Sequence, residues 1–276
     1  STPIKSSAAS DVYKRQQVYV IGCLSQRYGA ELQEEIPEVD AFFGKFDWKG
    51  VLERMGEHFD ERIRNQRVLT TPDHYAYLKI SEGCNRTCSY CAIPIMTGKH
   101  KSRDFEELLE ECRALVKGGV KEILVVAQDL TYYGIDLYGK NRLAELIGRI
   151  ADIEGLEWIK LHYAYPAGFP LELLTVMRER PNVCKYLDIA LQHCSDHMLQ
   201  QMRRGISKKQ TIELIRKIRQ EVPGIFIRTT LMTGHPGETA EDFEELCEFV
   251  REMRFERLGV FPYSHEDDTW CDPVSY

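Results

Sequence analysis

The chain has 276 residues, of which 43% are hydrophobic and 29% charged, and its formal net charge is −7. This composition predicts a globular protein with one large domain or two small ones and excludes a predominantly disordered chain. No apolar run approaches the roughly 18 residues of a membrane helix, and no signal-peptide core is present, so we expect a cytoplasmic protein without a membrane partner. The acidic balance makes nucleic acid a less favoured partner than a basic protein.

The two ends of the sequence differ from the rest. Residues 1–16 are small and polar without apolar periodicity, and residues 273–276 close the chain without a capping element. We expect both segments to be non-native additions. The native part would then run from Gln17 to Asp272 as a piece of a longer protein.

Residues 17–66 are predicted to form a small α/β domain. An apolar run predicts a strand over 18–21, and helical periodicity predicts helices over 26–35, before Pro37, and over 48–58. A charged connection follows at 61–71, and we expect a second domain over 67–272.

In the second domain, short β-rich runs alternate with longer segments of helical periodicity, which is the pattern of repeated βα units around a parallel sheet. Asp104 and Thr239 are predicted N-caps, with Glu107 and Asp242 in capping-box register. Six units are too few for a closed eight-fold barrel, so we expect an open partial (βα)6 TIM-like barrel with its site at the C-terminal strand ends. The predicted strands are 75–80, 122–127, 158–163, 186–191, 226–232 and 257–261, and the predicted helices are 104–117, 142–152, 171–179, 208–221 and 240–253.

Three cysteines directly after the first of these strands form a C-x3-C-x2-C run, Cys84, Cys88 and Cys91. Thiolates this close together can bind one metal centre. A zinc site normally takes four ligands, often as two C-x2-C pairs, and a four-iron cluster also usually takes four cysteines. Three cysteines would leave one iron of such a cluster without a protein ligand. The alternative is a zinc site whose fourth ligand is a distant Cys or His. We expect most of the other cysteines beyond Cys23 to be core residues.

Further motifs resemble the methylthiotransferase branch of the radical S-adenosylmethionine enzymes. The cysteine loop resembles the signature of these enzymes in its spacing and in Tyr90, the aromatic residue before the last cysteine. Within the branch, the lead-in 81–83, the exit 92–94 and residues 163–166 are most similar to enzymes that modify a ribosomal protein, rather than to those that modify transfer RNA. The resemblance runs from Gln17 to Asp272, and its other motifs lie at 126–134, 191–193, 202–205 and 234–239.

The resemblance implies a fold, cofactors and a reaction. The fold is the partial barrel of the radical S-adenosylmethionine type, preceded by a truncated N-terminal methylthiotransferase domain. Cys84, Cys88 and Cys91 would hold a four-iron cluster whose open iron binds S-adenosylmethionine, which one electron cleaves to a 5′-deoxyadenosyl radical. A methylthio group would then be added to the β-carbon of an aspartate in a small-subunit ribosomal protein.

The resemblance also implies a second four-iron cluster in the N-terminal domain. Cys23 corresponds to the third cysteine ligand of that cluster, and the other two have no counterpart in this chain. Sulfur on this cluster would be methylated by another S-adenosylmethionine molecule. The expected partners are the ribosomal protein or the ribosome, and a reductant such as flavodoxin or ferredoxin.

Several residues near strand ends are candidates for binding the cofactor. Gln128 and Gln192 follow the second and fourth strands, and we expect them to bind its amino-acid or ribose part. Arg203 or Arg204 would pair with its carboxylate, the alternative being a solvated helix end.

The segment 234–239, with Gly234 and Glu238, would place helix N-terminal amides against a polar group, the alternative being a plain turn. His193 and His235 are expected to be structural. Transfer RNA as substrate and a non-catalytic zinc or electron-transfer module remain the competing functions.

Overall fold

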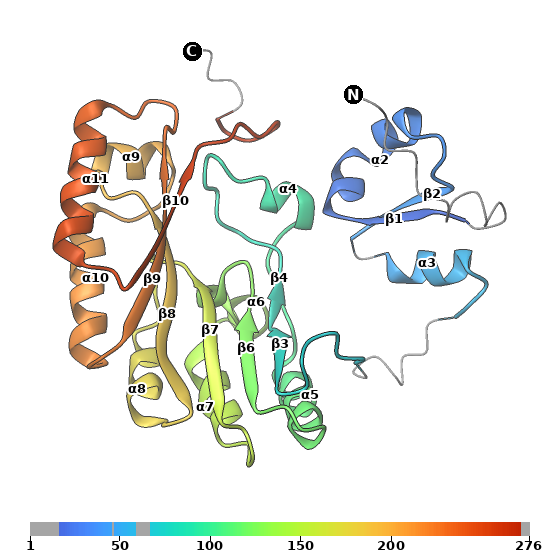
Figure 1. The fold of residues 1–276 in the computed structure, drawn as a ribbon, viewed down its shortest axis with the longest axis horizontal. Helices are drawn as coiled ribbons and strands as arrows, with labels where there is room; N and C mark the ends of the chain where they lie inside the picture. Colours follow the sequence, from blue (N-terminus) through green and yellow to red (C-terminus); the bar gives the residue numbers. More distant parts are fainter. Residues whose placement is uncertain (1–16, 46, 59–66, 272–276) are drawn as a thin grey trace. The chain divides into compact units, whose positions relative to one another are not determined.

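The computed structural model describes residues 17–45, 47–58 and 67–271, so the predicted leader 1–16 and tail 273–276 lie outside the described residues. The chain forms two compact units (Figure 1). The first unit comprises residues up to 64 together with 95–97, and the second comprises 65–94 and the residues from 98 onward. In the described part of the chain, every helix is too short or too polar to span a bilayer.

The first unit is a small βαβ arrangement followed by a helix. Strands β1 (Tyr19–Gly22) and β2 (Ala41–Gly44) pair in parallel, and helix α2 (Cys23–Glu35) connects them. The buried Ser25 hydroxyl donates to the carbonyl oxygen of Phe43 at 2.6 Å and so ties α2 to β2. Strand β2 was not predicted, because a four-residue run bounded by glycine has no readable period.

The helices of the first unit differ in length from the prediction. Helix α2 begins at Cys23, three residues before the predicted start, directly after Gly22 with its φ of 146°. Helix α3 (Trp48–Arg54) ends four residues earlier than predicted, and Gly56 follows it with a φ of 80°. A left-handed glycine of this kind commonly terminates a helix.

The second unit is built on a six-stranded sheet in which all strands are parallel and follow one another in chain order. Its edge strands are β3 (Tyr75–Lys79) and β10 (Arg257–Pro262), which do not pair with each other. The sheet is therefore open, and the predicted partial barrel is confirmed. The strands between are β6 (Glu122–Val126), β7 (Trp158–Ala164), β8 (Val183–Gln192) and β9 (Phe226–Thr233).

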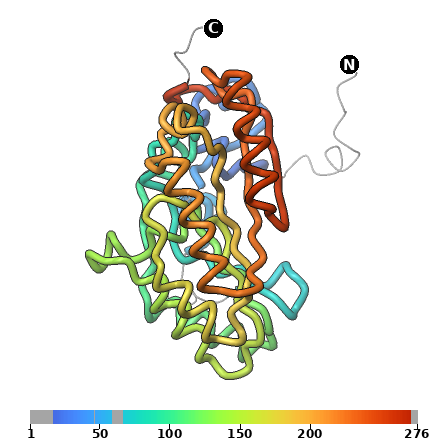
Figure 2. The backbone as a smooth tube through the Cα atoms, turned by 90° about the vertical axis from the view of Figure 1, so that its left-hand side faces the viewer, coloured from blue at the N-terminus to red at the C-terminus, as the bar shows by residue number. Residues whose placement is uncertain are grey.

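The five predicted helices of this unit are present within two residues of their expected bounds. Asp104 caps α5, with its carboxylate accepting from the backbone amides of Glu106 and Glu107 at 3.0 and 3.1 Å. Thr239 and Asp242 form the predicted capping box of α11. Figure 2 shows α10 and α11 on the side facing the viewer. The helices are α5 (Phe105–Lys117), α7 (Leu143–Ala151), α8 (Glu172–Glu179), α10 (Lys208–Glu221) and α11 (Ala240–Met253).

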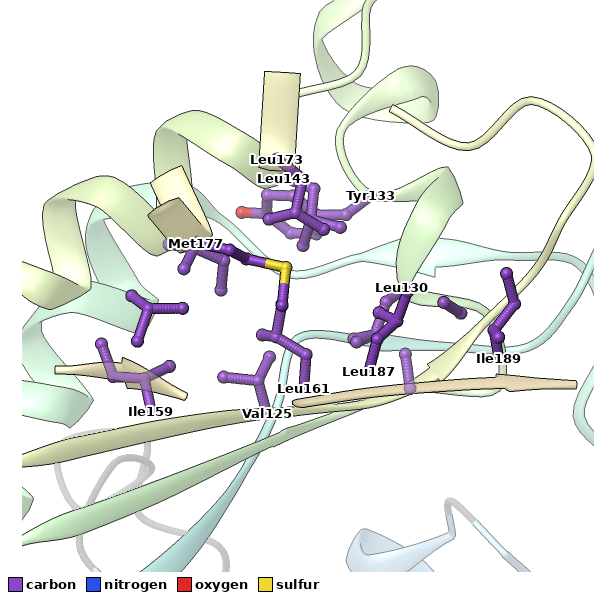
Figure 3. Packing of buried hydrophobic residues seen from close by; sticks show 14 of the residues in the cluster. Val125, Leu130, Tyr133, Leu143, Ile159, Leu161, Leu173, Met177, Leu187 and Ile189 are labelled. Carbon is purple, nitrogen blue, oxygen red and sulfur yellow. The ribbon is translucent and has the colours of Figure 1, made fainter. Parts of the chain in front are cut away.

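The core lies between the sheet and these helices. Alternate strand residues such as Val125, Leu161 and Leu187 are buried there, against Leu143 and Met177 of the helices (Figure 3). Full burial of each such side chain contributes about 1.5–3 kcal/mol. The opposite side of the sheet is less covered, and Tyr77 is 46% exposed there.

Short elements follow the C-terminal ends of the strands, and the sequence did not predict them because each has at most six residues, too few to show a repeated pattern. They include an antiparallel pair, β4 (Ser81–Glu82) with β5 (Lys101–Ser102), which closes the base of the cysteine loop. The others are α4 (Ile93–Thr97), the 3-10 helix η2 (Leu130–Tyr132), α6 (Ile135–Tyr138) and α9 (Asp196–Gln201).

Candidate functional site

The cysteine loop begins at Gly83, directly after β4. Gly83 has a φ of 77°, and a Cβ atom there would lie 2.7 Å from the carbonyl oxygen of Gly98 and would also collide with that of Lys99. That same Gly98 oxygen accepts from the amide of Cys84 at 3.2 Å. Only glycine allows this close approach of two backbone segments, which fixes the start of the loop.

The three thiols of the loop lie in a partly buried region. Cys88 is buried, and Cys84 and Cys91 are half-buried. The pKa of the Cys84 thiol is raised to about 11, mainly by burial and also by negative charge on Asp129, Cys88 and Cys91, while a hydrogen bond from the backbone amide of Arg86 opposes the rise. Burial also raises the pKa of Cys91. Thiolates in such a place need a compensating cation, and a coordinated metal supplies one.

Within the described residues, no three Cys, His, Asp or Glu side chains form a group that could hold a single metal ion. In a four-iron cluster each cysteine binds a different iron, so its ligands stand farther apart than those of one ion. Three mutually interacting thiols on one loop therefore fit a cluster by their donor chemistry.

Arg204 lies against the cysteine loop and is only 3% exposed, so for this residue the solvated helix end is wrong. One guanidinium nitrogen, Nη1, donates to the sulfur of Cys88 at 3.3 Å and to the hydroxyl of Tyr90 at 3.1 Å. The other, Nη2, donates to the carbonyl oxygen of Ala190. Nε is buried without a hydrogen-bond partner. The guanidinium thus connects the loop to β8 and keeps one donor free.

Ala190 accepts this bond because the pairing of β8 with β9 is irregular there. The register shifts between Ile189 and Gln192. Thr229 bridges the irregularity by donating to the carbonyl oxygen of Ile189 at 2.8 Å and accepting from the amide of Leu191 at 3.4 Å. The sequence contains no readable signal for this bulge, so the burial of Arg204 could not be predicted.

Arg86, inside the loop, was not singled out from the sequence. Its Nε donates to Asp129 at 2.8 Å, and its guanidinium lies 4.0 Å from the centre of the Tyr165 ring. Asp129 is 2% exposed and also caps η2, accepting from the Thr131 amide at 2.9 Å. The position of Arg86 between two of the three cysteines was the one signal that could have marked it.

Tyr165, which lies in the motif 163–166, contacts several parts of the site. Its hydroxyl donates to the carbonyl oxygen of Arg204 at 2.9 Å and lies 3.7 Å from the sulfur of Cys88. Its ring stacks on the Arg204 guanidinium at 4.2 Å. The loops after β6, β7 and β8 therefore all meet the cysteine loop, as expected where parallel strands end at one edge.

The two glutamines lie at the predicted strand ends. Gln128 donates from Nε2 to Glu82, and its Oε1 is buried without a hydrogen-bond partner. Gln192 is the last residue of β8 and has a left-handed φ of 71°. A buried, unpaired amide oxygen is costly, so a ligand donor would stabilise Gln128.

The segment 234–239 bonds largely to itself. The carboxylate of Glu238 accepts from the backbone amide of Gly234 through one oxygen. The other oxygen lies 3.0 Å from Nε2 of His193. Gly234 has a φ of 74°, which favours glycine. This geometry agrees with the plain-turn alternative for both residues.

Arg203 and Cys23 are the remaining predicted site residues. Arg203 is exposed, and its guanidinium lies 3.7 Å from the centre of the Trp270 ring. Cys23 is a half-buried residue of the first unit and is the first residue of α2.

A family model described as the radical SAM superfamily matches residues 78–250. This range includes the cysteine loop, the end of β3 and the four strands from β6 to β9. The chain belongs to the radical SAM superfamily. Membership implies a four-iron cluster and S-adenosylmethionine as cofactors.

Relatives of this radical SAM chain share one name, ribosomal protein uS12 methylthiotransferase RimO. The protein from Porphyromonas gingivalis is 66% identical over 255 residues, which are 92% of this chain and 59% of the relative. The one from Bacteroides fragilis is 64% identical over 93% of this chain and 59% of the relative. The chain thus spans about three fifths of the length of these curated relatives.

Solved structures show the same radical SAM fold at low identity. The methyltransferase TsrM from Kitasatospora setae superimposes with a TM-score of 0.71 at 14% identity, covering 93% of this chain and 58% of that one. Coproporphyrinogen III oxidase HemN from Escherichia coli gives 0.52 at 19% identity, covering 78% and 50%. At these identities the likeness concerns the fold alone.

Proposed function

We propose that the whole protein is a radical S-adenosylmethionine methylthiotransferase that modifies an aspartate of ribosomal protein uS12. The observation that carries this proposal is the 66% identity to a relative of that name over 92% of the chain. In this proposal residues 67–272 form the radical domain, and residues 17–66 belong to the N-terminal methylthiotransferase domain. The reaction takes place in the cytoplasm, with the ribosomal protein or the ribosome as partner.

Cys84, Cys88 and Cys91 hold the four-iron cluster in this proposal. When bound, the cluster supplies one electron for the reductive cleavage of S-adenosylmethionine. Arg204 positions the cysteine loop, because it donates to the sulfur of Cys88 and to the hydroxyl of Tyr90 while it also donates to a backbone carbonyl of β8. A hydrogen bond and a positive charge at a coordinating sulfur both favour its thiolate form.

The residues around the loop would orient S-adenosylmethionine. Gln128 offers a buried acceptor oxygen and Arg204 a buried donor at Nε, neither of which has a partner in the protein. In this proposal Tyr90 and Gln192 also bind S-adenosylmethionine, and the exposed guanidinium of Arg203 pairs with its carboxylate. Gly234 and Glu238 contribute through the turn that they stabilise.

The second cluster belongs to the whole protein in this proposal, with Cys23 as one of its three ligands. A reductant such as flavodoxin or ferredoxin delivers the electrons. Two separate clusters would allow one cluster to carry sulfur while the other generates the radical.

The first experiment tests the cluster and its ligands. The chain is reconstituted anaerobically with iron and sulfide, and charge-transfer absorbance, iron content and 5′-deoxyadenosine are measured after addition of reductant and S-adenosylmethionine. We expect Cys88→Ser to abolish all three signals, and Cys184→Ser, a half-buried cysteine at the start of β8, to retain them. Equal behaviour of the two variants would contradict the assignment.

The second experiment tests the substrate. Full-length enzyme is supplied with uS12 or with transfer RNA, and each product is examined by mass spectrometry for a methylthio addition. We expect the addition on an aspartate of uS12. Modification of transfer RNA instead would replace this substrate with the competing one.

A further inference from the structure

A second group of reactive side chains lies beside the cysteine loop and has no role in the proposed cofactor chemistry. It consists of Cys271, His235 and Ser89, which line one cavity of about 590 Å³. Cys271 is 5% exposed, and its backbone amide donates to the carbonyl oxygen of Ser89 at 3.0 Å. The segment after β10 is thereby held against the loop that carries the three predicted ligands.

His235 is oriented as a base toward Cys271. Its Nδ1 lies 2.8 Å from the carbonyl oxygen of Pro236 and must donate, because a carbonyl oxygen only accepts. In the neutral ring this leaves Nε2 as the acceptor, 3.2 Å from the sulfur of Cys271 and 3.0 Å from the hydroxyl of Ser89. Burial lowers the pKa of His235, which favours this neutral form.

This arrangement distinguishes Cys271 from the buried cysteines of the core. Cys112 and Cys194 are both fully buried, and burial raises the pKa of each thiol to about 12. Cys194 donates to the carbonyl oxygen of Glu245, at 3.6 Å. Thiols of that kind are inert, whereas a thiol beside an imidazole acceptor and a cavity can act as a nucleophile. The expectation that Cys271 is a core residue is therefore incomplete.

The same cavity offers a place for a small anion. Arg203 lines it with its guanidinium stacked on Trp270, and Gln200 and Gln201 line it as well. A guanidinium suits a carboxylate carried on a molecule of amino-acid size. A cavity of about 590 Å³ admits such a molecule.

We infer that Cys271 accepts sulfane sulfur from a small anionic persulfide that enters this cavity, with His235 as its base. The inference rests on the proposed function, since a methylthio group contains a sulfur atom that an aspartate lacks. Cys271 attacks the outer sulfur of the donor R–S–SH and forms a new S–S bond, while the S–S bond of the donor breaks. The donor leaves as R–SH after receiving the proton that His235 took from Cys271, so the donor is reduced and Cys271 becomes a persulfide.

The test uses cysteine persulfide as the probe on the reconstituted chain. The reaction is quenched with iodoacetamide, and peptide mass spectrometry measures the added sulfur atom at each cysteine over time. We expect Cys271 to react at least about tenfold faster than the half-buried Cys184 and Cys247. Equal rates at the three cysteines would overturn the inference.

Two variants separate the role of the base from unfolding. His235→Gln should slow persulfide formation at Cys271 about tenfold and leave Cys184 unchanged. Labelling of Cys112, which is 0% exposed in the fold, reports any unfolding in the same sample. If His235→Gln unfolds, Arg203→Gln takes its place, since loss of the exposed cation should slow the reaction of the anionic persulfide but not that of neutral iodoacetamide. An unchanged rate in the folded variant would overturn the inference.

This readout needs neither S-adenosylmethionine nor uS12, so its failure is distinguishable from failure of the proposed function. If Cys271 remains unmodified while the full-length enzyme modifies uS12, the inference alone is wrong. If full-length Cys271→Ser transfers methylthio groups at the wild-type rate from cysteine persulfide as sole sulfur source, the inference is also wrong. A large loss of transfer in that variant, with normal yields of 5′-deoxyadenosine, would support it.

Discussion

Replacement of Arg204 by methionine removes the link between the cysteine loop and the sheet while it preserves most of the side-chain volume. Arg204 is 3% exposed and donates to Cys88, Tyr90 and Ala190. After the change, the carbonyl of Ala190 would lose its side-chain donor, which costs about 1–3 kcal/mol for a buried group. Loss of the stacking on Tyr165 costs about 1–2 kcal/mol more.

Relief of the desolvation of the buried guanidinium offsets part of this cost, so we expect Arg204→Met to lower the free energy of unfolding by about 2–4 kcal/mol. The assay is urea unfolding of the chain, monitored by circular dichroism under anaerobic conditions. The variant should also retain less iron after reconstitution, because its loop is no longer held by β8.

The neighbouring Arg203 provides the matched control. It has an exposed guanidinium over the Trp270 ring, and such a contact contributes about 0.5–1 kcal/mol. Arg203→Met should therefore cost no more than about 1 kcal/mol. Equal losses for the two variants, or an unchanged stability of Arg204→Met with full iron content, would refute the argument that burial and the three donated bonds make Arg204 the link.

Three further predictions test the fold. Gly98→Ala should lower the free energy of unfolding by about 1–2 kcal/mol, because the φ of 73° is left-handed but a Cβ atom there would meet nothing within 4 Å. Gly83→Ala should lower it more and also reduce the iron content, because its Cβ atom would collide with backbone oxygens. Equal effects of the two variants in urea unfolding would contradict this. Asp242 has a pKa below its ordinary value because hydrogen bonds from Ser195, His197 and Thr239 outweigh burial, which raises it. The ionised Asp242 carboxylate therefore stabilises the fold above the ordinary carboxyl pKa of 3.8, and this stabilisation is lost as the pH falls below that value. Between about pH 5 and pH 2.5, Asp242→Asn should lose less stability than the wild type in acid unfolding curves. Leu161→Ala should cost about 2–5 kcal/mol in the core, against less than about 0.5 kcal/mol for Leu258→Ala on the exposed edge strand, and similar thermal shifts for both would show that Leu161 does not pack as described.

The sequence predicted the second unit well because its signals are local and repeated. Helices α10 and α11 have the predicted bounds, since capping residues and a periodic apolar face mark both ends. Strands of the parallel sheet were recognised from their apolar runs, which burial on the helical side requires. The elements that were missed, such as β2 and α9, have four and six residues and show no period.

The cysteine loop was also recognised from the sequence, because its three cysteines lie within eight residues of one another and their spacing predicts a metal centre. The contacts that surround the loop could not be predicted from the sequence. Arg86 meets Asp129 across 43 positions of the chain, Arg204 meets Cys88 across 116, and His235 meets Cys271 across 36. A single sequence contains no local pattern for such pairs.

The sequence by itself therefore determined the class of fold, the edge of the sheet where the site lies, and the three thiols of the loop. Only the tertiary structure decided that Arg204 is buried rather than solvated, that Glu238 stabilises its own turn, and that Cys271 faces an imidazole. The physical reason is that periodicity and spacing are properties of neighbouring residues, whereas burial, pairing and the pKa of a side chain depend on groups that the fold brings together from different strands.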